Sequence, residues 1–230
     1  MSAYQFDLSG RAALVTGGGI GGGRDIALAL AASGAAVAVN DINIERADFV
    51  AEAISADGGS AISLGADIAN RFQAAAMIER ARDAFGRIHI LVNATSIFHA
   101  EPMLTVDEWN WRRQIDVNMT GAFFCLQLIG RVMADEGGGS IINLASAEAC
   151  QSSLPEGIGY VASQAGIIGM TRQAARELAP HDVRVNCIAS EMGANPSPDC
   201  AAAALYLCSD GAKSVTGQLF VINGGNAIQG

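Results

Sequence analysis

Short runs of aliphatic and β-branched residues alternate along the chain with longer segments in which apolar residues recur every three or four positions. The short runs predict β-strands and the longer segments predict α-helices. We expect strands at 12–16, 35–41, 61–66, 88–94, 140–145, 183–189 and 218–223. We expect helices at 21–33, 44–57, 71–85, 106–116, 120–134, 158–178 and 199–207.

The strand segments indicate a parallel sheet. Residues 88–92 are almost continuously apolar, which is typical of a strand covered on both faces by helices. The alternation of strands and helices implies right-handed crossovers and an α/β, doubly wound sheet of about seven parallel strands. The 230 residues contain no repeat or linker and are too few for two ordinary domains. We therefore expect a single domain, 1–230.

Composition narrows the classes of function. The net charge of −9 repels phosphate backbones and argues against nucleic acid as a partner. The five cysteines form no C-x-x-C pair and the three histidines are far apart, so no metal site is expected. Neither a leader nor an uninterrupted run of 18 apolar residues is present. These features predict a cytoplasmic protein with free thiols and no membrane contact.

A glycine-rich loop follows the first strand segment. Gly17, Gly21 and Gly23 stand between that strand and the next helix. Such a loop lets the backbone approach a pyrophosphate, which the unpaired N–H groups of the helix N-terminus can then bind. A glycine cluster alone is a weak signal, because it is also typical of a flexible turn.

An acidic residue ends the second strand segment. Asp41 lies 24 positions after Gly17, near the spacing of a carboxylate that accepts hydrogen bonds from an adenosine ribose. That carboxylate would repel a 2′-phosphate, so NAD is predicted rather than NADP. The alternative is a solvated turn aspartate, but the loop, helix and acid together favour the cofactor site.

Together these motifs resemble the short-chain dehydrogenase/reductase family, which implies a Rossmann-type fold and nicotinamide chemistry. The resemblance covers nearly the whole chain. Its elements are Thr16-Gly17-x-x-x-Gly21-x-Gly23, Asp67-Ile68 as the adenine contact, Asn93-Ala94-Thr95, residues 109–123 with Asn118, Gly217 and Gly224-Gly225. Thr95 stands where the family has glycine.

The resemblance also assigns the catalytic residues. The family transfers hydride to or from nicotinamide while a tyrosine moves a proton to or from the substrate oxygen. Tyr160 matches that tyrosine, Ser146 the serine that holds the substrate oxygen, and Asn118 the asparagine of the proton relay. Gln164 occupies the position of the lysine four residues after the tyrosine.

Replacement of that lysine by Gln164 changes the expected chemistry. Residues 160 and 164 share one face of a helix. A lysine there would bind the nicotinamide ribose and lower the tyrosine pKa from about 10 toward neutrality. A glutamine can donate to ribose but carries no charge. At an unshifted pKa only roughly one phenol in a thousand is ionised at pH 7, so alcohol oxidation should be slow and ketone reduction less affected.

A second departure concerns the substrate cover. After the strand 183–189 the family has Pro-Gly and a long helical segment over the active site, whereas this chain has Ser190-Glu191. It then reaches Pro198 only 12 positions after Asn186. The resemblance therefore implies a largely deleted cover and a site open to water.

Three functions remain open, of which the last is an NAD-responsive binding module. In the first the chain is a catalytically degenerate subunit that assembles with an active relative into an alcohol or hydroxyacyl dehydrogenase, through helices 120–134 and 158–178. In the second it is an active NAD-dependent enzyme on a small alcohol or ketone, using Tyr160 without a lysine. Glu148 and Glu191 lie near the predicted rim, and either could replace a missing acid/base. We favour the degenerate subunit.

Overall fold

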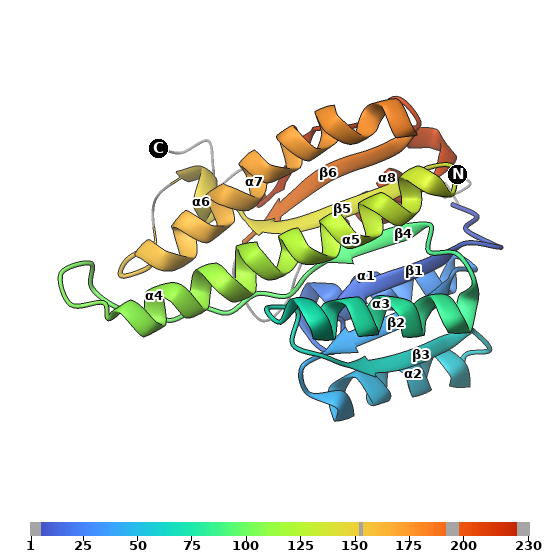
Figure 1. Cartoon of the computed structure of the whole chain (residues 1–230), viewed down its shortest axis with the longest axis horizontal. Helices are drawn as coiled ribbons and strands as arrows, with labels where there is room; N and C mark the ends of the chain where they lie inside the picture. The colour runs from blue at the N-terminus through green and yellow to red at the C-terminus, as the bar shows by residue number, and fades with distance from the viewer. Residues whose placement is uncertain (1–5, 152–153, 192–197, 225–230) are drawn as a thin grey trace.

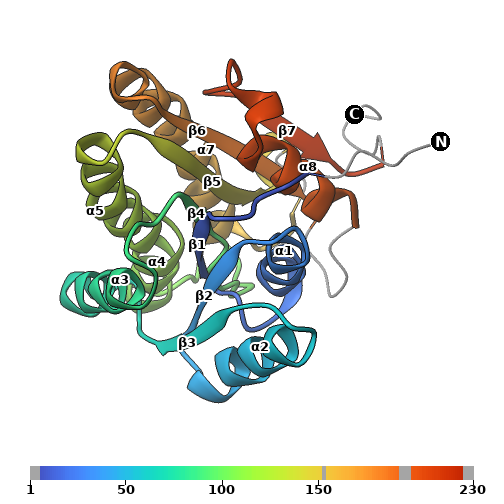
Figure 2. The same ribbon diagram turned by 90° about the vertical axis from the view of Figure 1, so that its right-hand side faces the viewer.

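The structure, a computed structural model, describes residues 6–151, 154–191 and 198–224. A seven-stranded parallel sheet with the order β3-β2-β1-β4-β5-β6-β7 forms its centre (Figures 1 and 2). The strands are β1 (Ala12–Thr16), β2 (Ala36–Asp41), β3 (Ala61–Gly65), β4 (Ile90–Asn93), β5 (Gly139–Ser146), β6 (Val183–Ser190) and β7 (Leu219–Ile222). The predicted doubly wound α/β fold is confirmed.

Helices cover both faces of the sheet (Figure 2). One apolar core packs α1, α2 and α8 against the sheet, and a second packs α3, α5 and α7 against the other face. The helices are α1 (Gly21–Ala32), α2 (Ile44–Ala56), α3 (Arg71–Phe85), α4 (Glu108–Ile115), α5 (Gly121–Asp135), α6 (Glu148–Gln151), α7 (Ile158–Leu178) and α8 (Pro198–Cys208). Short 3₁₀ turns lie at Ala179–His181 and Asp210–Ala212.

The helices predicted at 106–116 and 120–134 are one continuous helix. A π-helical turn, η1 (Asp116–Thr120), joins α4 to α5, so the backbone does not break between them. By length and composition this 28-residue helix could span a membrane, yet half of its most apolar window is buried inside the fold. The helix contacts α7, β4 and β5, and Figure 1 shows its ribbon beside α7. Its hydrophobicity therefore reflects this packing.

The strand order places a crevice at the carboxyl edge of the sheet. The chain runs from β1 outward to β2 and β3, then returns to pair β4 on the other side of β1. The loops after β1 and β4 therefore leave the sheet in opposite directions, which opens a space between them. The predicted site residues follow or end these same strands.

Candidate functional site

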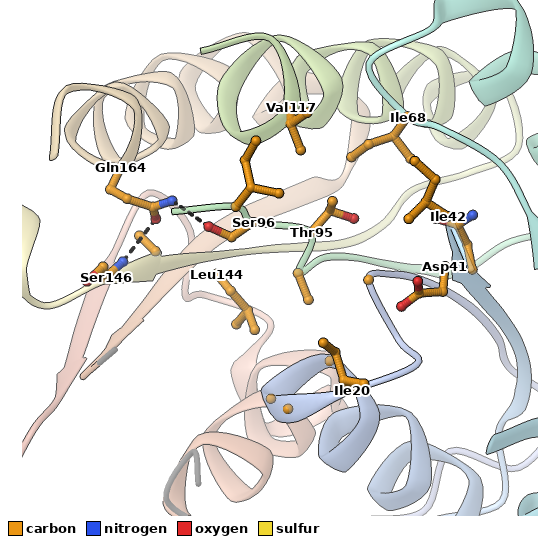
Figure 3. A pocket seen from close by; sticks show the side chains of 18 of the residues that line it. Ile20, Asp41, Ile42, Ile68, Thr95, Ser96, Val117, Leu144, Ser146 and Gln164 are labelled. Carbon is orange, nitrogen blue, oxygen red and sulfur yellow. Dashed lines mark hydrogen bonds between the residues drawn. The ribbon is translucent and has the colours of Figure 1, made fainter. Parts of the chain in front are cut away.

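A pocket of about 370 Å³ lies along this carboxyl edge (Figure 3). It is lined by the loop between β1 and α1, by the ends of β2, β4, β5 and β6, and by side chains from η1 and α7. Every predicted site residue except Asn93 and Asn118 lines it. Residues far apart in the sequence thus form one continuous surface, although contact with a dinucleotide stays a prediction.

The glycines of the loop are required by close backbone packing. A Cβ atom on Gly17 would lie 2.7 Å from the Cα atom of Thr95, and Gly17 adopts a positive φ of 61°. A Cβ atom on Gly23 would lie 2.3 Å from the carbonyl oxygen of Gly17. No side chain fits at either place without moving the backbone. The loop therefore stays thin, and α1 begins close to the ends of β1 and β4.

The N-terminus of α1 opens directly into the pocket. Gly21 has a positive φ of 56°, and the residue before the helix, Ile20, provides no side-chain cap. The first backbone N–H groups of a helix have no partner within it, and here no side chain replaces one. Because the glycines leave these N–H groups uncovered, the helix end fits a pyrophosphate.

Asp41 ends β2 as predicted. Its side chain is 6% exposed and accepts a hydrogen bond from the backbone N–H of Asn43 at 3.0 Å. That bond fixes the carboxylate beside the glycine loop, where a Cβ atom on Gly19 would lie 2.6 Å from its Oδ2 atom. The carboxylate of Asp41 is buried and oriented, which is unlike an aspartate in a solvated turn. Its position in the pocket suits an acceptor of hydrogen bonds from ribose hydroxyls.

Asp67 and Ile68 form the wall beyond β3. Asp67 pairs with Arg113 of α4 at 3.2 Å and caps the turn by accepting from the backbone N–H of Ala69. Ile68 is 2% exposed and packs closely against Gly121, where α5 begins. An apolar side chain beside fixed polar groups fits a heterocyclic ring, as the resemblance implies for adenine.

Two predicted site residues are engaged in scaffold contacts instead of lining the pocket. Asn93 donates to Asn143 Oδ1 at 2.9 Å, a contact between adjacent strands. Asn118 donates to the carbonyl oxygen of Ile97 and to Ser163 Oγ, both at 3.0 Å, and accepts from the N–H of Ile97 at 2.8 Å. Their amides therefore hold β5, α7 and the loop after β4 in place, and their predicted catalytic or cofactor roles are untested.

Tyr160 lies in the first turn of α7 with its ring packed edge-on against Phe98 at 5.2 Å between ring centroids. Burial raises the pKa of Tyr160, and the negative charge of Glu148 raises it further. Hydrogen bonds with Ser146 and Ser96 act in the opposite direction but do not outweigh burial. The phenol is thus held in its protonated form.

Gln164 lies one helical turn after Tyr160 and is 1% exposed. Its Oε1 atom accepts from the backbone N–H of Ser146 at 3.0 Å, and its Nε2 atom donates to Ser96 Oγ at 3.1 Å (Figure 3). The amide thus bridges the ends of β4 and β5. Sequence reasoning did not identify Ser96, because the family motif that it follows assigns it no role.

No lysine or arginine in the described part of the chain is among the groups that shift the pKa of Tyr160. The sequence contains one lysine, Lys213, which follows α8 and pairs with Asp210. The pocket itself contains Arg46 beside Asp41 and Arg113 beside Asp67, both toward the β2 side. The charge that would activate the phenol is therefore absent from the described residues around it.

The predicted short cover lies mostly outside the described residues. Ser190 and Glu191 line the pocket at the end of β6, whereas residues 192–197 and Gly225 are not described. In the described part of the chain, no three His, Cys, Asp or Glu side chains group as metal ligands would.

Comparison with known proteins gives a consistent result. Residues 11–195 match the family described as "short chain dehydrogenase". The chain is 34% identical to D-threitol dehydrogenase of Mycolicibacterium smegmatis, over 98% of this chain and 96% of that protein. It is 35% identical to the 3-oxoacyl-[acyl-carrier-protein] reductase FabG of Staphylococcus aureus, over 94% and 97% of the two chains.

Two further similarities bear on function. The chain is 32% identical to the (2S)-[(R)-hydroxy(phenyl)methyl]succinyl-CoA dehydrogenase subunit BbsD of Thauera aromatica, over 96% of this chain and 98% of that protein. Among solved structures, a putative short-chain alcohol dehydrogenase from Sinorhizobium meliloti 1021 superposes with a TM-score of 0.91 at 35% identity, covering 96% of this chain and 98% of that one.

Proposed function

Because this chain belongs to the short-chain dehydrogenase/reductase family, we propose that it binds NAD but is a catalytically degenerate subunit of a hetero-oligomeric alcohol or hydroxyacyl dehydrogenase. The family uses NAD or NADP, and its members named above are oxidoreductases. Among the two cofactors, the buried carboxylate of Asp41 favours NAD, because a 2′-phosphate would meet a fixed negative charge. The open glycine loop supports binding of the pyrophosphate.

One observation supports the proposal that the chain is catalytically degenerate: the buried amide of Gln164 stands where the family's lysine is expected. A cation at this place would stabilise the phenolate of Tyr160. The amide is neutral, both of its ends are hydrogen-bonded to the scaffold, and burial raises the pKa of Tyr160. Each pKa unit above neutrality lowers the available base about tenfold, so proton removal from an alcohol is slow.

The bound cofactor would supply or accept the hydride. The residues of this chain would position it, with the α1 N-terminus at the pyrophosphate, Asp41 at the adenosine ribose and Ile68 at the adenine. Tyr160 can still donate its proton to a substrate oxygen, and this supports the alternative function as a weak ketone reductase.

Assembly with a related subunit is supported by an apolar surface on the long helix and the start of α7. Trp111 is 38% exposed, Phe123 40% and Ile158 40%. Large apolar side chains left exposed, such as these, mark interaction sites. One relative is named as a dehydrogenase subunit, which supports a partner of the same family.

The four described buried thiols, including Cys125 and Cys187, fit a reducing cytosol as the location.

The test compares binding with turnover. The isolated chain should quench or shift NADH fluorescence on binding, yet oxidise D-threitol with NAD at least a hundredfold more slowly than an active relative measured in parallel. Co-expression with a family member encoded nearby should yield a complex of higher native mass. Turnover by the isolated chain at the rate of the active relative would refute the degenerate function.

A Gln164→Lys variant separates charge from architecture. If only the charge is missing, this variant gains alcohol oxidation by at least tenfold. Lysine cannot accept from the N–H of Ser146, so that donor loses its partner at a cost of about 1–3 kcal/mol in stability. A Gln173→Lys variant, on an exposed position of α7, is the matched control and should change neither quantity.

A further inference from the structure

A carboxylate holds the serine of the candidate catalytic site. Ser146 ends β5, and two residues later Glu148 opens the short helix α6. The Ser146 hydroxyl donates a hydrogen bond to the Glu148 carboxylate. Ser146 is 2% exposed and lines the pocket together with Tyr160, so this partly buried bond lies at the pocket wall. Nothing in the family resemblance requires a carboxylate at this position.

A serine hydroxyl has only one proton to donate. When that proton is shared with Glu148, Ser146 can accept hydrogen bonds but cannot donate a second one. A substrate carbonyl oxygen and an alkoxide are both acceptors, so neither can be held by this hydroxyl. A hydrogen bond with Ser146 lowers the pKa of Tyr160, so engagement of the Ser146 proton by Glu148 also withdraws a donor that would stabilise the phenolate.

The charge of Glu148 acts in the same direction. Among the described groups that shift the pKa of Tyr160, Glu148 is the one that carries a charge, and the other two are the hydroxyls of Ser146 and Ser96. A negative charge beside the phenol opposes the phenolate that alcohol oxidation needs and the alkoxide that ketone reduction develops. The loss of a cation at Gln164 and the gain of an anion at Glu148 thus add.

We propose that Glu148 is a positioning residue that, together with Gln164, holds the site inactive toward alcohols and ketones by engaging the hydroxyl of Ser146 and placing a negative charge beside Tyr160. This inference rests on the proposed degenerate function. It attributes the lack of activity to two residues, Gln164 and Glu148, instead of one. Replacing Gln164 alone is therefore predicted to restore little activity.

The experiment uses the full chain with Glu148→Ala, Glu148→Gln, Gln164→Lys and the Glu148→Ala/Gln164→Lys double variant. Alanine releases Ser146 and removes the charge, whereas glutamine removes the charge but keeps an acceptor for Ser146. The matched control is Glu156→Gln, an exposed carboxylate four residues before Tyr160. NADH binding reports that each variant is folded.

The first readout is phenolate ultraviolet absorbance between about pH 8 and 10, with the Tyr160→Phe spectrum subtracted to remove the other two tyrosines. At a given pH, Glu148→Gln should increase the phenolate fraction of Tyr160 about two- to threefold over wild type, because Glu148 contributes less to the raised pKa of Tyr160 than burial does. The double variant should exceed Gln164→Lys by a similar factor, and Glu156→Gln should equal wild type. A Glu148→Gln spectrum identical to wild type overturns the proposal.

The second readout is NAD-linked oxidation of D-threitol and NADH-linked reduction of a short 3-oxoacyl thioester. The double variant should be at least tenfold more active than Gln164→Lys on one of them, and Glu148→Ala should restore more than Glu148→Gln. Equal rates for the double and Gln164→Lys variants on both probes overturn the role of Glu148. Rapid turnover by the wild-type chain would instead refute the proposed function, and the phenolate spectra would still decide whether Glu148 acts on Tyr160.

Discussion

At the scale of the residue, Asp41 is expected to decide which dinucleotide binds. Its carboxylate is buried and oriented by the N–H of Asn43. An Asp41→Asn variant keeps that acceptor but removes the charge, so the ratio of NADPH to NADH affinity should rise about tenfold, corresponding to about 1.4 kcal/mol. Fluorescence titration with both cofactors measures the ratio. Glu45→Gln makes the same charge change on an exposed neighbour and should leave the ratio alone.

His89 is expected to make stability depend on pH. Its Nδ1 atom accepts from the backbone N–H of Ala12 at 3.0 Å, so the imidazole must be neutral in this bond. Burial, with Arg87 and Arg11 nearby, lowers the pKa of His89 below its ordinary value of 6.5. The unfolded chain therefore binds the proton more readily than the folded one. The stability that this bond contributes is complete above about pH 6.5 and is lost as the pH falls toward the folded pKa.

Urea unfolding at about pH 7.5 and pH 5.5 measures this effect. A His89→Asn variant, whose amide oxygen can accept without titrating, should lose less stability between these two pH values than wild type. A His181→Asn variant, at the exposed turn after α7, should behave like wild type. Equal losses for wild type and His89→Asn would contradict the assignment.

Single residues also show what sequence reasoning could reach. The position of Asp41 followed from its spacing after Gly17 and those of Tyr160 and Gln164 from the family resemblance, and these side chains do line one pocket. The bridge through Ser96 could not be predicted, because it depends on where side chains from distant segments meet. The contact between Ser146 and Glu148 is local, but it depends on the turn between β5 and α6, which no sequence pattern indicated. Asn93 and Asn118 belong to the family motifs, but only the structure shows that their amides hold the backbone.

At the scale of the element, the π-helical turn η1 places Asn118 against the loop after β4. An Asn118→Ala variant leaves both the N–H and the carbonyl oxygen of Ile97 without a partner. We expect a loss of about 2–4 kcal/mol in the free energy of unfolding, measured by urea denaturation. Ser163→Ala removes one hydrogen bond of the Asn118 side chain and should lower the free energy of unfolding by about 1 kcal/mol. Equal losses would mean that the Ile97 loop does not depend on Asn118.

Two glycines give opposite expectations for the same substitution. Gly23→Ala places a methyl group against the carbonyl oxygen of Gly17, so the loop and the start of α1 must shift. NADH affinity should fall at least tenfold, with a loss of about 1–3 kcal/mol in stability. Gly169 lies on an exposed face of α7 with nothing near its Cβ position, so Gly169→Ala should stabilise the protein by up to about 1 kcal/mol.

The elements themselves were accessible from periodicity. Every predicted strand and helix exists, with ends within two residues of the prediction. Two exceptions have local causes. The π-helical turn η1 keeps the backbone helical at the place where the spacing of apolar residues changes, so two predicted helices form one. The four-residue helix α6 is too short to show a period. The segment where the cover was predicted to be short lies outside the described residues.

At the scale of the whole molecule, the apolar surface on the long helix is expected to set the native mass. Phe123 is 40% exposed on α5, although its neighbours pack inward. We expect the purified chain to elute above the 23.6 kDa of a monomer, and Phe123→Arg to shift it toward that mass. Light scattering gives both masses. Phe72→Arg, on the more exposed 86% position of α3, should leave the mass unchanged.

The scarcity of lysine has a practical consequence. Lys213 is 77% exposed and lies near Arg11 and Asp210, at the edge of the sheet where the strands begin. The pocket lies at the opposite edge, where the strands end. An amine-reactive dye will therefore label this one side chain and the chain's α-amino group. Anisotropy of protein labelled at Lys213 can then follow assembly with a partner from a position away from the pocket.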